Sequence, residues 1–170
     1  MLLLAVMLAG AAPQAPAPAT RTSTRHLDVA SSVSIKAGKV VLVVDVSPKD
    51  AMHVYSPEQK DYIPVSLKIE TVDGLTASPA EFPKAEKRAF PALNETQLVY
   101  SRPFRITLPV TIRGTLAGTI KGTLRYQACD ETICYIPVNV PLTWTLPDRQ
   151  LPAAGFQLPA ASSHRPGLKN

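Results

Sequence analysis

Apolar and polar residues alternate with a period of two along much of the chain between His26 and Leu146. The clearest run has apolar residues at positions 104, 106, 108, 110 and 112, with Arg105, Thr107 and Thr111 among the residues between them. Such alternation is typical of a strand that has one face on a core and the other in solvent. We therefore predict a strand over residues 104–112.

Two later segments continue the pattern. The inward positions are Leu116, Ile120, Leu124 and Tyr126 in the first, and Val138, Val140, Leu142, Trp144 and Leu146 in the second. We expect Tyr126 and Trp144 to belong to the core. Earlier strands are predicted at Leu27–Ile35, Lys39–Val46, Val65–Val72 and Gln97–Tyr100. The segment Lys39–Val46 is almost continuously apolar, which predicts a central strand buried on both sides.

Turn signals such as Asp73-Gly74 and Arg113-Gly114 separate these runs. Seven or eight short strands without a convincing helix predict an all-β fold, an immunoglobulin-like β-sandwich. Residues 77–96 do not fit the pattern, because they contain three prolines and no clear period. A segment of this kind is either a functional loop or a solvated crossover between sheets.

The length of 170 residues fits one domain, which we place at residues 20–148. The 17 prolines disfavour long helices. The formal charge of +5 comes from Arg21, Arg25, Arg149, Arg165 and Lys169, which lie outside residues 26–148. Within that range the 13 basic side chains balance the 13 acidic ones. A basic patch that would bind nucleic acid is therefore not expected.

The two ends differ from the domain. Residues 1–19 begin MLLLAVMLAGAA and continue as a Pro/Ala-rich leader, with no Lys or Arg before the apolar run. That run is too short for a stable membrane span, which needs about 20 apolar residues, and it predicts a secretory signal peptide. Residues 149–170 are rich in Pro, Ala and Ser and predict a flexible tail. We expect a periplasmic or secreted protein, in which disulfides are permitted.

Cys129 and Cys134 are the two cysteines of the chain, and they flank a short connection between predicted strands. Neighbouring antiparallel strands easily bring two cysteines to bonding distance. In the chain-entropy model, closing a loop of about six residues contributes roughly 2.2 kcal/mol, against about 4 kcal/mol for about 50 residues. A chain of this length needs no bridge to fold. The pair is thus either a redox site or a weak structural staple.

Asp130 and Glu131 lie beside Cys129, and the loop contains no Lys, Arg or His. Because carboxylates raise the pKa of a nearby thiol, we expect them to keep the resting thiols protonated. This chemistry suits an electron carrier that reacts when a partner docks. A third interpretation is a Cu(I) site, in which the two thiolates act with Met52 and His53. We expect no bound metal and no cofactor.

The segment YQACDETICYIPVNVPLTW, residues 126–144, resembles the closing signature of the N-terminal periplasmic domain of the thiol:disulfide interchange protein DsbD. Residues 52–70 and 99–112 are similar to further segments of that family. The resemblance spans roughly residues 26–146. It implies an immunoglobulin-like sandwich with one reversible disulfide. It also implies electron transfer between a membrane-embedded thiol reductant and periplasmic thioredoxin-fold proteins.

Within this resemblance, Cys129 and Cys134 match the redox pair, and His53 and Tyr55 match positions that line the site. Residues 90–95 fall where the family has a cap loop over the disulfide. In place of a Phe-Tyr-Gly cap this chain has AFPALN, which makes Phe90 the expected shielding ring and Leu93 its alternative. The family's membrane domain and thioredoxin-like domain are absent from this sequence, so we expect the reductant to be a separate protein.

The expected function is therefore thiol–disulfide exchange of the protein-disulfide reductase type through Cys129 and Cys134. The alternative is a non-enzymatic immunoglobulin-like interaction domain in which the same disulfide is structural.

Overall fold

The computed structural model describes residues 19–36, 39–114 and 118–146, and its regular structure is almost entirely β-strand. In chain order the strands are β1 (Thr20–Ser23), β2 (Leu27–Lys36), β3 (Lys39–Pro48), β4 (His53–Tyr55), β5 (Ser66–Ile69), β6 (Leu75–Ala77), β7 (Glu86–Phe90), β8 (Glu95–Tyr100), β9 (Phe104–Ile112), β10 (Gly118–Tyr126), β11 (Ala128–Cys129) and β12 (Val138–Leu146). A 3₁₀ turn, η1 (Pro91–Leu93), separates β7 from β8. The all-β prediction is confirmed, although the predicted number of strands is too low.

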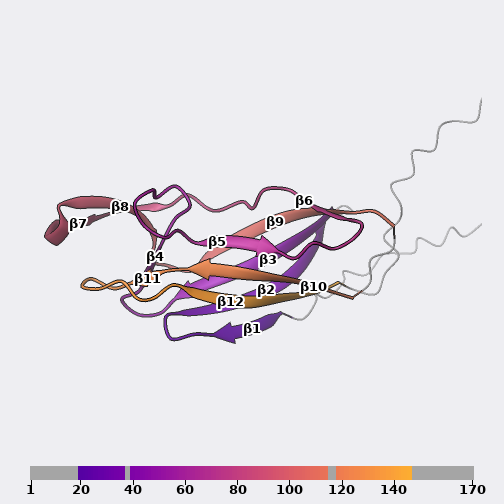
Figure 1. Cartoon of the computed structure of the whole chain (residues 1–170), viewed down its shortest axis with the longest axis horizontal. Coiled ribbons are helices and arrows are strands. Elements are labelled where there is room, and N and C mark those ends of the chain that lie inside the picture. Colours follow the sequence, from indigo (N-terminus) through magenta and orange to yellow (C-terminus); the bar gives the residue numbers. More distant parts are fainter. Residues whose placement is uncertain (1–18, 37–38, 115–117, 147–170) are drawn as a thin grey trace, which may run out of the picture.

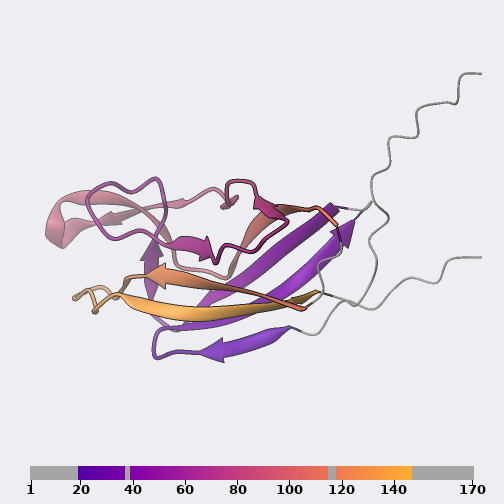
Figure 2. The ribbon, with the colours of Figure 1, turned by 45° about the vertical axis from the view of Figure 1, so that its right-hand side comes forward.

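The strands form three sheets (Figure 1). The first has five strands in the order β1-β2-β3-β9-β6, and the second has three in the order β12-β10-β5. The third has four strands in the order β11-β4-β8-β7. Figures 1 and 2 show the first two sheets layered on each other, with β7 and β8 extending beyond one end of the sandwich.

The main core lies between the first two sheets. Alternate residues of β3, β9, β10 and β12 supply it, including Leu42, Ile106, Leu124, Tyr126 and Trp144. The indole N–H of Trp144 donates to the carbonyl oxygen of Val43 at 3.0 Å, and the Ser31 hydroxyl donates to the carbonyl oxygen of Thr143 at 2.7 Å. These hydrogen bonds join the two sheets. Tyr126 and Trp144 are fully buried, as the alternation predicts.

Six predicted strands are confirmed as β2, β3, β8, β9, β10 and β12, whereas β5 is shorter than the predicted Val65–Val72. The prediction that Lys39–Val46 is buried on both sides is only partly right. Val40, Leu42 and Val44 face the core, but Val41 and Asp45 are half-buried. The outer face is partly open, and the Asp45 carboxylate accepts hydrogen bonds there from Arg105 at 2.7 and 3.0 Å.

The segment 77–96 contains a hairpin rather than one continuous loop. β7 and β8 pair in antiparallel register, with Phe90 opposite Glu95. Pro91 begins the tight turn η1, and Asn94 ends it with a left-handed φ of 54°. Proline has a fixed φ suited to such a start, and asparagine tolerates the left-handed region. This turn chemistry holds Phe90 at the point where the chain reverses.

Three sequence predictions fall outside the described residues: positions 1–18 of the signal segment, the inward placement of Leu116, and the tail at 149–170. Among the residues that the structure describes, no helix has the length and apolar character needed to cross a membrane.

Candidate active site

One face of the four-stranded sheet collects the residues that the sequence singles out. The register places Cys129 opposite His53, Tyr55 opposite Val99, Arg88 opposite Gln97, and Phe90 opposite Glu95. Residues opposite one another in antiparallel strands project to the same side of the sheet. The alternate residues Val54, Tyr100 and Ala128 project to the other side and join the main core. The four-stranded sheet therefore separates the sandwich core from a second cluster built around Cys129.

Cys129 and Cys134 form a disulfide, with their Cα atoms 4.0 Å apart. Cys129 lies at the end of β11 and is 2% exposed, whereas Cys134 is exposed. The loop between them is closed by backbone hydrogen bonds from Asp130 N to Ile133 O and from Tyr135 N to Ala128 O. The bridge thus presents one cysteine to solvent and keeps the other beneath the surface.

Tyr55 brings its hydroxyl group to both sulfur atoms. The oxygen lies 3.4 Å from Cys129 Sγ and 3.5 Å from Cys134 Sγ. The ring is 2% exposed and stacks on Tyr62 with centroids 4.3 Å apart. Burial raises the pKa of Tyr55 to about 12, with smaller effects from Tyr62 and Glu95. The hydroxyl therefore keeps its proton at neutral pH and is available as a hydrogen-bond donor to sulfur.

Phe90 and His53 form the wall beside Tyr55. Phe90 is 6% exposed and belongs to the cluster around Cys129, and its ring centroid lies 5.0 Å from that of His53. His53 in turn meets Tyr55 edge to face at 5.7 Å. Leu93, by contrast, is 57% exposed at the tip of the hairpin. Of the two cap candidates, Phe90 is the one that packs into this cluster.

Asp130 shapes the cysteine loop. Its Oδ1 accepts the backbone N–H groups of Thr132 and Ile133 at 2.7 and 2.8 Å, and its Oδ2 accepts the hydroxyl of Tyr135 at 2.8 Å. These hydrogen bonds to the ionised form, led by the Ile133 backbone, lower the pKa of Asp130. The carboxylate is thus engaged in holding the turn between the two cysteines.

Arg88 brings a positive charge to the site that the cysteine loop itself does not contain. Its guanidinium pairs with the carboxylate of Glu131 and lies over the ring of Phe90, 5.4 Å from the centroid. Because Arg88 belongs to β7 and Glu131 to the cysteine loop, this contact ties the cap hairpin to the disulfide. It also offsets the Glu131 charge, which the sequence suggested would act on the thiols unopposed.

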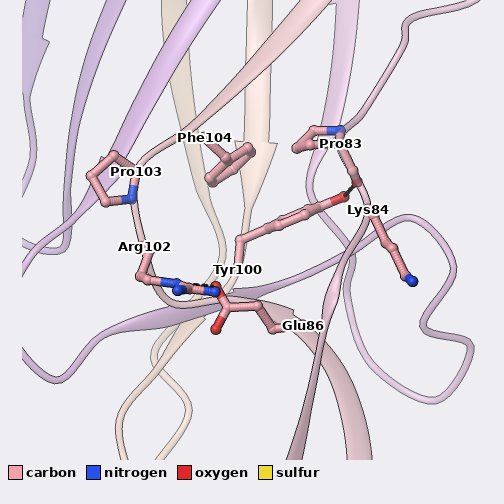
Figure 3. A pocket seen from close by; sticks show the side chains of 7 residues that line it. All are labelled: Pro83, Lys84, Glu86, Tyr100, Arg102, Pro103 and Phe104. Carbon is pink, nitrogen blue, oxygen red and sulfur yellow. Dashed lines mark hydrogen bonds and ion pairs between the residues drawn. The ribbon is translucent and has the colours of Figure 1, made fainter.

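The base of the cap hairpin is fixed to the sandwich around a cavity of about 380 Å³ (Figure 3). The Tyr100 hydroxyl donates to the carbonyl oxygen of Pro83 at 2.7 Å, and the Tyr100 ring stacks on Phe104 at 4.3 Å. The Glu86 carboxylate accepts hydrogen bonds from Ser101 and Arg102. The residues lining this cavity include neither cysteine. We assign it to the anchoring of β7 and β8.

The donor set considered for Cu(I) does not come together on one face. Met52 packs against the main core, whereas His53 lies beside Cys129 on the opposite side of the four-stranded sheet. In the part of the chain that the structure describes, no group of three or more His, Cys, Asp or Glu residues is placed to hold a metal ion.

Comparison with known protein families identifies the family to which this chain belongs. The family model for the N-terminal part of the thiol:disulfide interchange protein DsbD matches residues 24–143, which include both cysteines and the whole cluster around them. The chain belongs to this family. Its immunoglobulin-like fold is that of the DsbD N-terminal domain. No curated protein matches the chain by sequence.

Three solved structures are similar to this chain. The N-terminal periplasmic domain of ScsB from Proteus mirabilis is 12% identical with a TM-score of 0.52; the match covers 72% of this chain and 49% of the other. The reduced DsbD N-terminal domain of Neisseria meningitidis is 21% identical, with a TM-score of 0.46 and coverages of 68% and 82%. A complex between the DsbD N-terminal and PilB N-terminal domains of Neisseria meningitidis is 19% identical with a TM-score of 0.45. That match covers 68% of this chain and 80% of the other.

The site contains residues that sequence reasoning missed. Arg88, Tyr62 and Gln97 were not singled out, although Arg88 pairs with Glu131, Tyr62 stacks on Tyr55, and Gln97 is fully buried. The signal for Arg88 was its position two residues before Phe90, which puts both side chains on one face of a strand. That signal becomes visible only once β7 is recognised as a strand.

Proposed function

We propose that this chain is a thiol–disulfide exchange module that passes two electrons through a reversible Cys129–Cys134 disulfide. The observation that carries the proposal is the asymmetry of the bridge. Cys134 is exposed, whereas Cys129 is 2% exposed among Tyr55, Phe90 and Val99. A purely structural staple has no need of one open cysteine and an aromatic cluster around the other.

The exchange begins at Cys134. A partner's thiolate attacks Cys134 Sγ, a new sulfur–sulfur bond forms, and Cys129 leaves with the electron pair of the old bond as a thiolate. A second thiolate of the partner then attacks the partner's own sulfur in the mixed disulfide and releases Cys134. The partner becomes a disulfide, and the two cysteines of the module take protons from water. In the reverse direction, the reduced module reduces a partner's disulfide by the same steps.

Tyr55 and the cap have separate roles in this scheme. The Tyr55 hydroxyl, 3.4 Å from Cys129 Sγ, donates a hydrogen bond to the thiolate as it leaves. Phe90 covers the buried side of the bridge and is held in place by the Arg88–Glu131 pair. The cap therefore leaves Cys134 as the accessible sulfur and limits reaction at Cys129 with unintended thiols.

Protein partners are favoured by the surface around Cys134. The large exposed apolar side chains of the described residues include Ile133, Ile136 and Leu93, which lie in or beside the cysteine loop and at the cap tip. Exposed apolar groups around a reactive atom suit a docking surface. We propose periplasmic or secreted thioredoxin-fold proteins as clients and a membrane-embedded thiol protein as reductant. In support, the Neisseria DsbD N-terminal domain is seen in complex with the PilB N-terminal domain.

Trapping of mixed disulfides tests the proposal. A purified thioredoxin-fold protein that keeps its attacking cysteine but lacks the resolving one is incubated with the Cys129→Ser and Cys134→Ser variants, each activated as a mixed disulfide with a small aromatic thiol. Cys129→Ser, which retains the exposed Cys134, is expected to form the covalent complex rapidly. Cys134→Ser is expected to form little. Equal, slow capture by both variants would favour the structural staple.

A further inference from the structure

His53 is a buried side chain whose polar atoms are unused in the disulfide form. The residue is 1% exposed, and neither Nδ1 nor Nε2 has a hydrogen-bond partner among the described residues. A buried polar group without a partner is uncommon in proteins, because burial removes the water that would otherwise hydrogen-bond to it. His53 therefore calls for a physical explanation.

The position of His53 suggests one. His53 in β4 pairs directly with Cys129 in β11, so the two side chains leave the same face of the sheet side by side. Side chains in such pairs have Cβ atoms about 4.5–5.5 Å apart. The ring is enclosed on other sides by Phe90 at 5.0 Å and the edge contact with Tyr55 at 5.7 Å. Reduction of the disulfide therefore changes the hydrogen-bonding chemistry of a side chain that is paired with His53 across the strands.

The charge state of the ring fits a neutral hydrogen-bonding role. Burial is the largest influence on the His53 pKa and lowers it, and Arg88 of β7 lowers it further. Glu131 and Asp130 of the cysteine loop raise it by smaller amounts. A neutral imidazole has one N–H donor and one bare nitrogen that accepts.

The disulfide is a poor hydrogen-bonding partner for the His53 ring. A disulfide sulfur has no hydrogen to donate and is a weak acceptor. After reduction, Cys129 carries either an S–H group, which can donate to the bare nitrogen, or a thiolate, which accepts from the N–H in a charge-assisted hydrogen bond. Either protonation state of Cys129 then matches one of the two ring nitrogens.

We propose that His53 is the hydrogen-bonding partner of the Cys129 sulfur in the reduced protein and that it thereby shifts the thiol–disulfide equilibrium toward the dithiol. This inference deepens the proposed function and rests on it, since it assigns a residue to the reversible couple. One hydrogen bond present in only one of two redox states changes their ratio by about tenfold. For a two-electron couple this ratio corresponds to about 30 mV.

The reduction potential of the full chain tests the proposal. Wild type and His53→Phe are equilibrated with glutathione redox buffers, and the dithiol fraction is measured by alkylation and mass. His53→Phe keeps an aromatic ring but removes both nitrogens, and we expect its reduction equilibrium constant to be about tenfold lower. At least one of His53→Asn and His53→Gln, which restore polar atoms, is expected to return most of the difference.

His26→Phe is the matched control. His26 is also buried and also has two ring nitrogens without partners among the described residues. It too lies beside the cysteine loop, with its ring tilted against that of Tyr135 and the centroids 4.4 Å apart. It does not pair with a cysteine, so its replacement is expected to leave the equilibrium constant unchanged. An unchanged constant in His53→Phe, or an equal shift in His26→Phe, would overturn the proposal.

A second measurement covers the case in which His53→Phe does not fold, and the proposed function has a separate test. If His53→Phe does not fold, the ¹⁵N shifts of the histidine rings in the wild-type protein decide: reduction must move the His53 nitrogens, and unchanged shifts refute the contact. The proposed function is judged separately, by the absolute potential of the wild type. A wild-type disulfide too stable for a carrier, with the His53→Phe difference still present, would reject the carrier function and leave the role of His53 intact.

Discussion

The replacement Tyr55→Phe isolates the contribution of one hydroxyl group to the proposed chemistry. The change removes only an oxygen that lies 3.4 and 3.5 Å from the two sulfur atoms, and it retains the ring that stacks on Tyr62. Because the Tyr55 pKa is raised to about 12 by burial, the wild-type hydroxyl is protonated across the neutral range. It can therefore donate to a thiolate throughout a titration of the cysteines.

The size of the effect follows from this contact. A hydrogen bond to a charged group contributes about 1.5–3 kcal/mol, and one pKa unit corresponds to about 1.36 kcal/mol. Loss of the hydroxyl is thus expected to raise the lower of the two thiol pKa values in the reduced protein by about one to two units. Since the thiolate is also the leaving group, exchange at neutral pH is expected to slow by about tenfold or more.

The assay is the pH dependence of thiolate absorbance in the reduced protein, checked by the rate of alkylation. Tyr62→Phe is the matched control, because its hydroxyl donates to Glu95 Oε2 at 2.7 Å rather than to sulfur. We expect its thiol titration to follow the wild type. If Tyr55→Phe titrates like the wild type, or if both variants shift equally, the assigned hydrogen bond is wrong.

Three further predictions concern the cap and the loop. Phe90→Ala is expected to lower the unfolding free energy by about 3 kcal/mol and to speed reduction of the disulfide by dithiothreitol. Leu93→Ala, at an exposed position, is expected to change neither the unfolding free energy nor the reduction rate. Equal reduction rates in the two variants would contradict the shielding role of Phe90. Arg88→Gln and Glu131→Gln are each expected to speed reduction by dithiothreitol, and the double variant is expected to react no faster than either single variant. In denaturant titrations the two side chains are expected to show a coupling energy of about 0.2–1 kcal/mol. Additive effects of the two substitutions would contradict the proposed ion pair between the cap hairpin and the cysteine loop. Asp130→Asn is expected to be less stable than the wild type at neutral pH. Because the folded-state pKa of Asp130 is lowered from 3.8, its contribution is present above that value and is lost as the pH falls through the lower folded value. The difference in denaturation midpoint must therefore shrink on acidification, and a constant difference would refute the assigned hydrogen bonds.

The long strands of the sandwich, β2, β3, β9, β10 and β12, were predictable because they carry a strong local signal. In β9 and β12 the alternation of apolar and polar residues is nearly complete, and turn residues mark several of the connections. In the four-stranded sheet, β8 had been predicted, but β4 and β11 had no such signal. β4 has three residues and β11 has two, and a period of two cannot be recognised over so few positions. Their pairing depends on partners far away in the sequence.

The site was predictable to the extent that its residues lie close in sequence or match a known family. Cys129, Cys134, His53, Tyr55 and Phe90 all meet in the structure. The electrostatic setting could not be predicted in the same way, since Arg88 and Glu131 are 43 residues apart. It stays a prediction that the negative charges of Asp130 and Glu131 keep the thiols protonated, and the structure gives both carboxylates additional partners.

The reduction potential of the wild-type Cys129–Cys134 disulfide tests the central claim most directly. The oxidised chain is equilibrated with glutathione buffers of known ratio, and the fraction of dithiol is measured after rapid acid quenching and alkylation. A carrier must be both reducible and oxidisable by its partners, so we predict a value of roughly −200 to −250 mV. A value of about −300 mV or lower is that of a structural disulfide and would contradict the proposed function.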